Sequence, residues 1–337
     1  MNSRERIRTI IDGGEPDRCG LWLGNPHKDT WPIYLKAFDL PDEESVRRHF
    51  QDDFRWIRPG ENDYKHPEGR PIFDNPRSGV ELSAGGVFAD CEDAQEVEDF
   101  AWPNPDFLDF SHTLEALDAA GDLYRASGFW CPFFHNLCDF LGMENYFIKM
   151  YTHPEVVHAI TRHVVDFYLE ANRRFFQAAG PRVDGFFFGN DFGSQRGLLI
   201  GPNLFDEFVA PYFRQLTELG HEYDYQVILH SCGSIHTVLP RIVDMGVDAL
   251  HPLQAKAANM DAATLARDFG KQLAFMGGID TQDLLVNGTP EEVKEDVRRV
   301  KSLLGPNLIV SPSHEALLPN VPAENVRAMA EAALEQN

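Results

Sequence analysis

The feature that most constrains the fold is a repeated alternation between short apolar runs and longer amphipathic segments. Runs such as FFFG and VILH are apolar throughout, which is typical of strands buried on both faces of a parallel sheet. Strand–helix alternation of this kind predicts βα units of the α/β class, in a sheet that is either open or closed. The expected strands are Gly20–Leu23, Gly128–Phe134, Gly185–Gly189, Gln226–His230, Ala249–Pro252, Leu273–Met276 and Leu308–Ser311.

Amphipathic segments between these runs predict the helices. Thr289 is an expected N-cap because Pro and two acidic residues follow it, and Asp261 is a weaker N-cap signal. Residues 25–125 alternate less clearly and are rich in Asp, Pro and Trp, so we expect an irregular insertion there. The expected helices are Pro154–Gln177, Pro202–Leu219, Ser234–Met245, Met260–Phe269 and Thr289–Leu304.

Composition narrows the range of partners and compartments. A net charge of -23 argues against nucleic acid or an anionic membrane surface as a partner, since both would repel the chain. The sequence has no apolar run of about 18 residues, which excludes a membrane span, and its charged start lacks the apolar core of a signal peptide. Five scattered cysteines fit a reducing compartment, and we therefore expect a cytoplasmic protein.

Polar residues follow five successive predicted strands. Because parallel sheets carry their chemistry at the carboxyl ends of the strands, these residues predict one active site. Asp280 has an equally good explanation as the cap of the next helix. The residues concerned are Asn190, Asp191, Gln195, His230, Cys232, Gln254, Asp280, His314 and Glu315.

The sequence His-Ser-Cys at the end of one strand is the strongest chemical signal. His230 and Cys232 lie two residues apart, so in an extended chain their side chains point to the same side. This pair suits zinc, but it also suits a structural strand end with a packed Cys and a capping His. With His314 or Glu315 as a third ligand, the set resembles catalytic zinc sites, which keep a fourth position open. No phosphate-binding loop, dinucleotide fingerprint or G-x-S-x-G turn competes with this interpretation.

Several motifs together resemble the uroporphyrinogen decarboxylase superfamily. They are NDFGSQRGLLIGPNLFDEFVAPYF, HSCGSI, HPLQAKAANMD, FMGGIDTQDLLVNGTPEEV and SHEALLPNVPAENVRAM. The resemblance implies a single (β/α)8 barrel of the TIM type for residues 1–337, with the irregular N-terminal segment over the barrel mouth.

The superfamily includes porphyrin decarboxylases and corrinoid-linked methyltransferases. The decarboxylases carry a paired-Arg loop near the amino end, but the corresponding segment here reads LWLGNPHKDTW and lacks the pair. The methyltransferases bind zinc through His-x-Cys and a late Cys. His230 and Cys232 match the first two ligands, whereas His314 or Glu315 stands near the late position.

The resemblance therefore implies a zinc-dependent methyltransferase. It would move a methyl group between a small methylated substrate, or a thiol or folate acceptor, and a corrinoid carried on a separate protein. Asp191 would supply acid–base catalysis, and Asn190, Gln195, Gln254 and Asp280 would bind the substrate. The alternatives are a metal-free decarboxylase or lyase on a small carboxylated substrate, and a non-catalytic binding protein. A homodimer is compatible with the sequence, which does not determine the oligomeric state.

Overall fold

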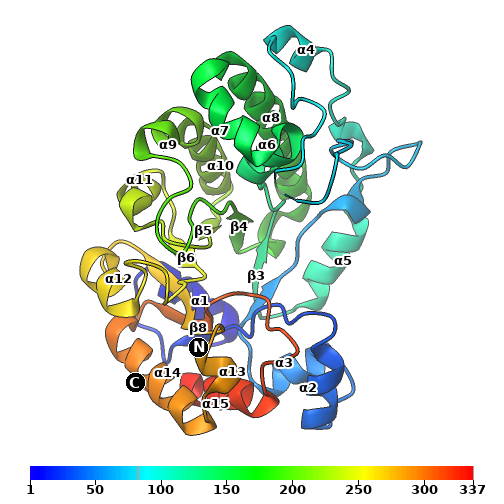
Figure 1. The fold of residues 1–337 in the computed structure, drawn as a ribbon. Helices are drawn as coiled ribbons and strands as arrows, with labels where there is room; N and C mark the ends of the chain where they lie inside the picture. Colours follow the sequence, from blue (N-terminus) through cyan, green and yellow to red (C-terminus); the bar gives the residue numbers. More distant parts are fainter. Residues whose placement is uncertain (82, 337) are drawn as a thin grey trace.

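The computed structural model describes residues 1–81 and 83–336, and its strands form one parallel sheet at the centre of the molecule (Figure 1). The strand order is β1-β8-β7-β6-β5-β4-β3-β2, so β1 and β2 are the two ends of the sheet. The expected (β/α)8 barrel is confirmed. The strands are β1 Gly20–Leu21, β2 Phe54–Trp56, β3 Tyr124–Ser127, β4 Gly185–Gly189, β5 Gln226–His230, β6 Ala249–His251, β7 Ala274–Ile279 and β8 Leu308–Pro312.

Asp53 joins the two ends of the sheet. Its backbone N–H donates to the Leu21 carbonyl, at 2.9 Å, and its carboxylate accepts the Leu21 N–H at 3.0 Å. The carboxylate is fully buried and also pairs with Arg6 and Arg18, each at 2.8 Å. One side chain therefore completes the barrel where the strands β1 and β2 are too short to pair regularly.

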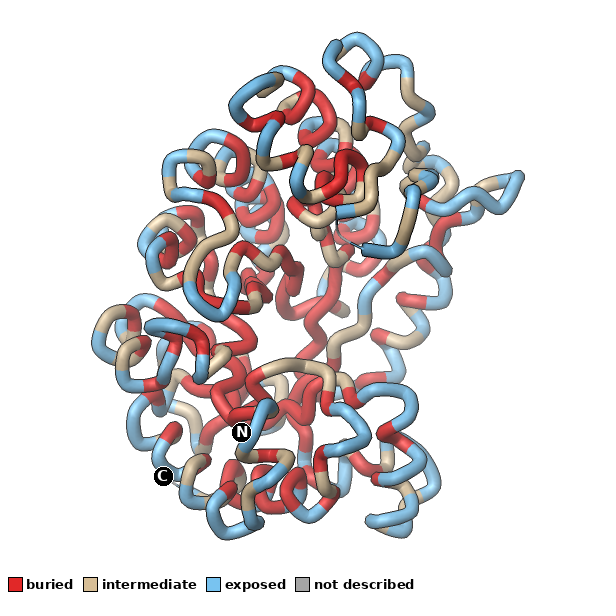
Figure 2. Tube along the Cα trace, viewed as in Figure 1, coloured by how far each residue is buried: buried red, intermediate tan, exposed pale blue. Residues whose placement is uncertain are grey.

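The helices surround the sheet, and burial follows this arrangement. Figure 2 shows buried residues in the central strands and on the inner helix faces, with exposed residues on the outer turns. Among the residues described, no helix has both the length and the apolar character needed to cross a bilayer. The α-helices are α1 Ser3–Ile11, α2 Trp31–Phe38, α3 Glu43–His49, α4 Ala94–Glu98, α5 Ser111–Ala119, α6 Phe133–Leu141, α7 Met143–Thr152, α8 Pro154–Ala179, α9 Pro202–Phe208, α10 Ala210–Glu222, α11 Leu239–Asp244, α12 Ala262–Phe269, α13 Leu284–Asn287, α14 Pro290–Leu304 and α15 Ala323–Leu334.

The barrel interior is filled by its own cluster of apolar side chains. The helix α1 contributes Ile7, Ile10 and Ile11 to this cluster, so it covers the amino-terminal end of the barrel. Trp22, Phe54 and Phe187 fill the middle, and Trp56 and Trp130 pack against the cluster. The opposite, carboxyl end of the strands is therefore the end that is left for a functional site.

The predicted strand Gly128–Phe134 is wrong. The strand β3 ends at Ser127, because Gly128 has a φ of 101° and the residues after Pro132 begin α6. The strand β2 was missed because it is three residues long and follows two acidic residues.

The range predicted to be irregular, residues 25–125, is too wide. It contains α2, α3, β2 and α5 of the barrel, and its irregular part is confined to about residues 57–110 beside α6 and α8 (Figure 1).

The helix predictions hold at the N-caps Asp261 and Thr289, whereas the helix expected from Ser234 begins only at Leu239, after a 3-10 turn at His236–Val238. The Thr289 hydroxyl accepts the Glu292 N–H in a capping box, and the Asp261 carboxylate accepts the Thr264 N–H. The expected helix Pro202–Leu219 is divided at Val209 into α9 and α10, where Pro211 cannot continue the hydrogen-bond pattern of α9.

Candidate metal centre at the barrel mouth

Two aligned strand ends build the centre of the site. His230 is the last residue of β5, and in the parallel register it lies opposite Gly189 of β4 and His251 of β6. Neighbouring residues in register point their side chains to the same face of a sheet. The apolar run QVILH therefore brings the His230 imidazole beside the His251 imidazole at the carboxyl end of the barrel.

The Nε2 atom of His230 faces a thiol and a carboxylate. It lies 3.3 Å from Cys232 Sγ and 3.3 Å from Asp191 Oδ1. The Cys232 backbone N–H donates to Asp191 Oδ1 at 2.7 Å, which fixes the carboxylate against the loop. These three side chains can offer one atom each within 4.8 Å of one another. Tetrahedral zinc with bonds of 2.0–2.3 Å would separate neighbouring ligand atoms by about 3.3–3.6 Å, which agrees with both distances.

The Nδ1 atom of His230 faces a second group, His251 and Glu315. Its distance to His251 Nδ1 is 2.9 Å, and Glu315 Oε2 lies 3.7 Å away. One ligand atom from each of His230, His251 and Glu315 also lies within 4.8 Å of the others. However, 2.9 Å is shorter than the separation of two nitrogen ligands on zinc and is typical of a hydrogen bond. We therefore assign the Nε2 side to metal binding and the Nδ1 side to orientation.

This assignment would fix the proton positions in the metal-bound protein. With a metal bound, Nε2 would need its lone pair, so the proton of His230 would lie on Nδ1 and be donated to His251 Nδ1. His251 would then carry its own proton on Nε2, which is buried and has no hydrogen-bond partner among the described residues. Burial lowers the pKa of His251 well below its usual range, so its imidazole is neutral and able to accept. Without a metal, the Nε2 of His230 can instead donate to Asp191 Oδ1, which lies 3.3 Å away.

Burial and charge set the protonation of the other donors. Burial raises the pKa of the Cys232 thiol far above its usual range, and the carboxylates of Asp191 and Glu315 add to the effect. Burial alone would also raise the pKa of Asp191, but hydrogen bonds from His230 and from the Cys232 N–H hold it well below its usual range. A divalent cation would reverse the preference of the thiol, since a coordinating thiol is deprotonated.

His314 and Glu315 lie on the loop after β8, with different surroundings. His314 Nδ1 accepts the Ala316 N–H at 3.1 Å and lies 3.5 Å from Glu315 Oε2. Its ring centroid is 6.4 Å from that of His230. Glu315 Oε2 is buried and accepts no hydrogen bond from any residue that the structure describes. The structure brings both residues to the site, with Glu315 nearer to His230.

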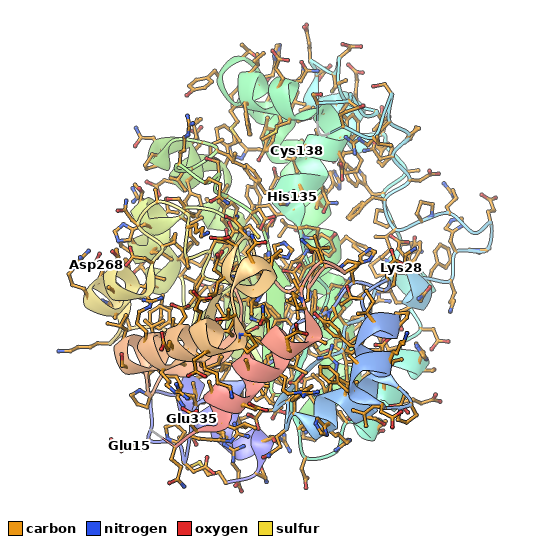
Figure 3. All side chains as sticks on the ribbon, turned by 60° about the horizontal axis from the view of Figure 1, so that its bottom comes forward. Glu15, Lys28, His135, Cys138, Asp268 and Glu335 are labelled. Atoms are coloured by element: carbon orange, nitrogen blue, oxygen red, sulfur yellow. The ribbon has the colours of Figure 1, made fainter. Side chains whose placement is uncertain are left out.

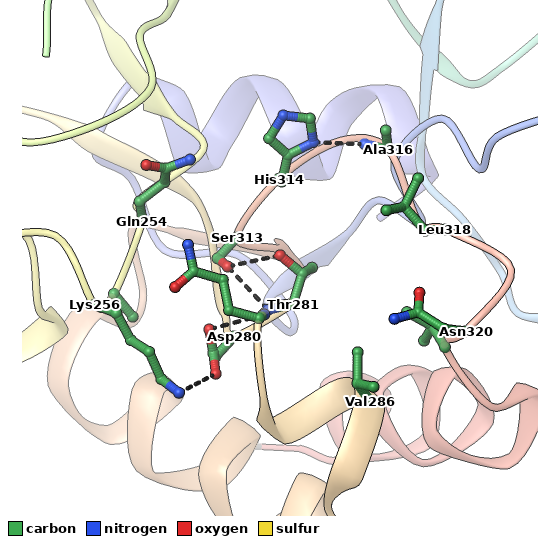
Figure 4. Close-up of a pocket in the computed structure, with 13 residues that line it drawn as sticks. Gln254, Lys256, Asp280, Thr281, Val286, Ser313, His314, Ala316, Leu318 and Asn320 are labelled. Carbon is green, nitrogen blue, oxygen red and sulfur yellow. Dashed lines mark hydrogen bonds and ion pairs between the residues drawn. The ribbon is translucent and has the colours of Figure 1, made fainter. Parts of the chain in front are cut away.

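A cavity of about 440 Å³ adjoins the centre between the loops that follow β6, β7 and β8 (Figure 4). His314 and Gln254 line it, as do Lys256 and Asp280, whose side chains are 3.1 Å apart. The cavity is large enough for a small organic molecule.

The four predicted substrate-binding residues differ in how free their side chains are. Asn190 is buried, accepts the Phe134 N–H and donates to the Cys131 carbonyl, so its amide positions the loop after β3. Gln254 Oε1 accepts from the Gly233 N–H at 2.8 Å and from Gln195 at 3.4 Å. Asp280 accepts the N–H groups of residues 282–284 and so caps α13, while it also lines the cavity. Substrate binding by these residues remains a prediction.

Three residues of the site were not anticipated. His251 is the most important, and its signal was the register that aligns it with His230. Trp130 lies on the loop after β3 with its ring 5.1 Å from that of His230. His135 of α6, labelled in Figure 3, has Nε2 3.7 Å from Asp191 Oδ2. Trp130 was missed because it fell inside the wrongly predicted strand Gly128–Phe134, and His135 because its position on α6 was not predicted.

Comparisons with known proteins were made by family model, by sequence and by structure. A family model described as uroporphyrinogen decarboxylase (URO-D) matches residues 93–336. A methylated-thiol–coenzyme M methyltransferase of Methanosarcina mazei is 29% identical over 198 residues, 58% of this chain and 48% of that protein. A methylcobamide:CoM methyltransferase of Methanosarcina acetivorans is 29% identical over 135 residues, 40% of this chain and 38% of that protein. The chain thus matches about half, or less, of these relatives' lengths.

A solved methyltransferase from Methanosarcina mazei has the same fold. Its TM-score is 0.70 at 16% sequence identity, and the match covers 99% of this chain and 98% of that one.

Proposed function

Because the chain belongs to the uroporphyrinogen decarboxylase family, we propose that it is a zinc-dependent methyltransferase working with a corrinoid protein. The observation that carries the proposal is the close approach of His230 Nε2, Cys232 Sγ and Asp191 Oδ1 at the barrel mouth. The matched relatives are methyltransferases by name and support the same activity, although this chain matches only part of their length.

The donor set fits zinc in kind as well as in spacing. Zinc in proteins is bound by thiolate, imidazole and carboxylate side chains. A catalytic zinc site has three such protein ligands and leaves the fourth coordination position open. We assign Asp191 as the third ligand because its oxygen is already at ligand spacing on the Nε2 side. His314 and Glu315, the ligands expected from the sequence, lie toward the Nδ1 side and are tested separately below. When bound, zinc would act as a Lewis acid on a methylated atom or keep a thiol acceptor ionised near neutral pH.

The remaining side chains have roles that follow from their contacts. His251 holds the His230 ring through Nδ1, as the outer partners of metal-binding histidines commonly do. The Trp130 and Trp22 rings cover His230 and His251, with centroids 5.1 and 5.2 Å away, and keep water from this side. The unpartnered oxygen of Glu315 is the base that we assign to accept the proton of a thiol acceptor.

The corrinoid partner would approach the carboxyl end of the strands. All the candidate ligands lie at this end, and the cavity beside His314 opens there. The opposite end is filled by α1 and the isoleucines of the interior cluster. The carboxyl end of the barrel is therefore the face at which a corrinoid protein would exchange the methyl group.

The test uses methylcobalamin as the methyl donor and 2-mercaptoethanesulfonate as the acceptor, without oxygen. Zinc-loaded protein should consume methylcobalamin, as followed by the change in its visible absorbance, and Cys232→Ala should abolish the reaction. Cys91→Ala removes a thiol whose nearest hydrogen-bond partner is the Asp93 carbonyl, away from the barrel mouth, and should keep full activity. Equal rates for the wild type and Cys232→Ala, or no consumption above the rate without protein, would contradict the proposal.

A further inference from the structure

A second cavity lies at the barrel mouth, on the side of β2 and β3, and the metal centre does not use it. Its volume is about 350 Å³, within the range of small-molecule sites. Trp130 lines the cavity and also covers the His230 ring, so this one indole separates the cavity from the metal centre. The aromatic residues in its wall are Phe73, Phe129, Trp130, Phe140 and Tyr168.

Arg58 supplies the cavity with a positive charge. It follows β2 by two residues, and its guanidinium carbon lies 5.2 Å from the centre of the Trp56 ring. The ring centres of Trp56 and Trp130 are 4.8 Å apart, and those of Trp130 and His230 are 5.1 Å apart. The Arg58 guanidinium, the two indoles and the His230 imidazole therefore form a continuous row of contacts. In the described part of the chain, no carboxylate lies within ion-pair distance of Arg58.

This lack of a partner separates Arg58 from the other cations that line the two cavities. Arg77, in the same cavity, pairs with Asp139 at 2.7 Å, and Lys256 of the other cavity pairs with Asp280 and Asp283. In a chain of charge -23, carboxylates are plentiful, yet none among the described residues forms an ion pair with Arg58. Arg58 is an exposed residue, although partial burial of its side chain lowers its pKa, with the Tyr168 hydroxyl acting in the opposite direction. An arginine remains charged at neutral pH in such surroundings.

Two acidic residues also line the cavity. Asp139 is neutralised by Arg77, and Glu61 Oε2 accepts the Ile72 N–H at 3.0 Å. Glu61 therefore adds a negative charge to the cavity wall without forming an ion pair with Arg58, and this charge opposes the binding of a negative ligand. Removal of the Arg58 charge should therefore weaken the binding of a negative ligand, and removal of the Glu61 charge should strengthen it.

We propose that this cavity binds a flat, singly charged organic acid, with the acid group on Arg58 and the ring against the aromatic wall. The planar guanidinium matches a carboxylate or sulfonate through two parallel hydrogen bonds, and the aromatic side chains provide a surface for a ring. That such an acid is the small substrate of methyl transfer rests on the proposed function. The binding of the acid does not depend on the proposed function, because Arg58 is not among the metal-binding candidates.

The test measures binding of 4-methoxybenzoate by calorimetry at low salt, with uncharged 4-methoxybenzamide as the matched ligand. We expect the acid to bind at least about tenfold more tightly than the amide, because a hydrogen bond to a charged group contributes that much. Arg58→Gln should weaken the acid by the same factor and leave the amide unchanged. Glu61→Gln should strengthen binding of the acid, and Arg58→Lys should give an intermediate affinity.

Arg70→Gln is the control, since Arg70 lies on the same segment with its guanidinium 3.4 Å from the Glu68 carboxylate. It should bind the acid like the wild type. Equal affinity for acid and amide, an unchanged affinity in Arg58→Gln, or no binding of the acid at 10 mM would overturn the proposal. The same measurements on Cys232→Ala separate the two proposals: retained binding there supports the acid site even if methyl transfer fails.

Discussion

Replacing His251 with Phe tests how the structure orients the metal-binding histidine. The substitution keeps a ring of similar size under Trp22 but removes the acceptor that lies 2.9 Å from His230 Nδ1. His251 is fully buried and His230 is nearly so, hence water cannot replace the lost bond. A buried donor left without a partner costs about 1–3 kcal/mol. Loss of an orienting partner typically lowers metal affinity about 10- to 100-fold.

The assay is a zinc titration in competition with a chromogenic chelator, accompanied by thermal unfolding of the metal-free protein. We expect His251→Phe to bind zinc about 10- to 100-fold more weakly than the wild type. His236→Phe is the control, because its imidazole pairs with Asp268 outside the barrel mouth, at 2.8 Å. Unchanged affinity would refute the orienting role. Complete loss of zinc, with binding retained in Cys232→Ala, would show instead that His230, His251 and Glu315 hold the metal.

Three further predictions concern the third ligand, the barrel closure and the substrate class. Because Asp191 is the assigned third ligand, His314→Ala and Glu315→Gln should keep most of the zinc affinity in the same chelator competition; a loss of at least about tenfold in His314→Ala, which the sequence predicts, would make His314 the third ligand instead. Asp53→Asn should lower the free energy of unfolding by about 3–5 kcal/mol in urea denaturation, because Arg6 and Arg18 lose a buried partner; a loss below about 1 kcal/mol would show that the pairs contribute little. Uroporphyrinogen should not be decarboxylated in an anaerobic assay, since the paired-Arg loop is missing from LWLGNPHKDTW, and measurable turnover would restore the decarboxylase alternative.

The sequence predicted the barrel where its strands are apolar and well separated. The strands β4 and β5 agree with their predicted bounds because GFFFG and QVILH are buried on both faces and bounded by turn residues. The run GFWCPFF is equally apolar but is not a strand. In this run the positive φ of Gly128 ends the strand, and α6 begins after Pro132. The apolar composition of the run does not show that these two residues interrupt the strand.

The site was predictable where its residues are close in sequence. His230 and Cys232 are two residues apart, so their joint position follows from the strand alone. His251 and Asp191 reach the same imidazole from β6 and β4, and their contacts depend on a register that the sequence does not fix residue by residue. The free guanidinium of Arg58 was unpredictable for a further reason, since it follows β2, the strand that was missed.

Zinc content is the most direct measure of the central claim, that this barrel holds a catalytic metal at His230 and Cys232. Elemental analysis of protein purified without chelators should give about one zinc per chain, as expected of a site with three protein ligands. Cys232→Ala should lose most of this zinc, while Cys91→Ala, with a thermal unfolding curve like that of the wild type, should keep it. Well under half an equivalent in the wild type, or equal zinc in Cys232→Ala, would contradict the account.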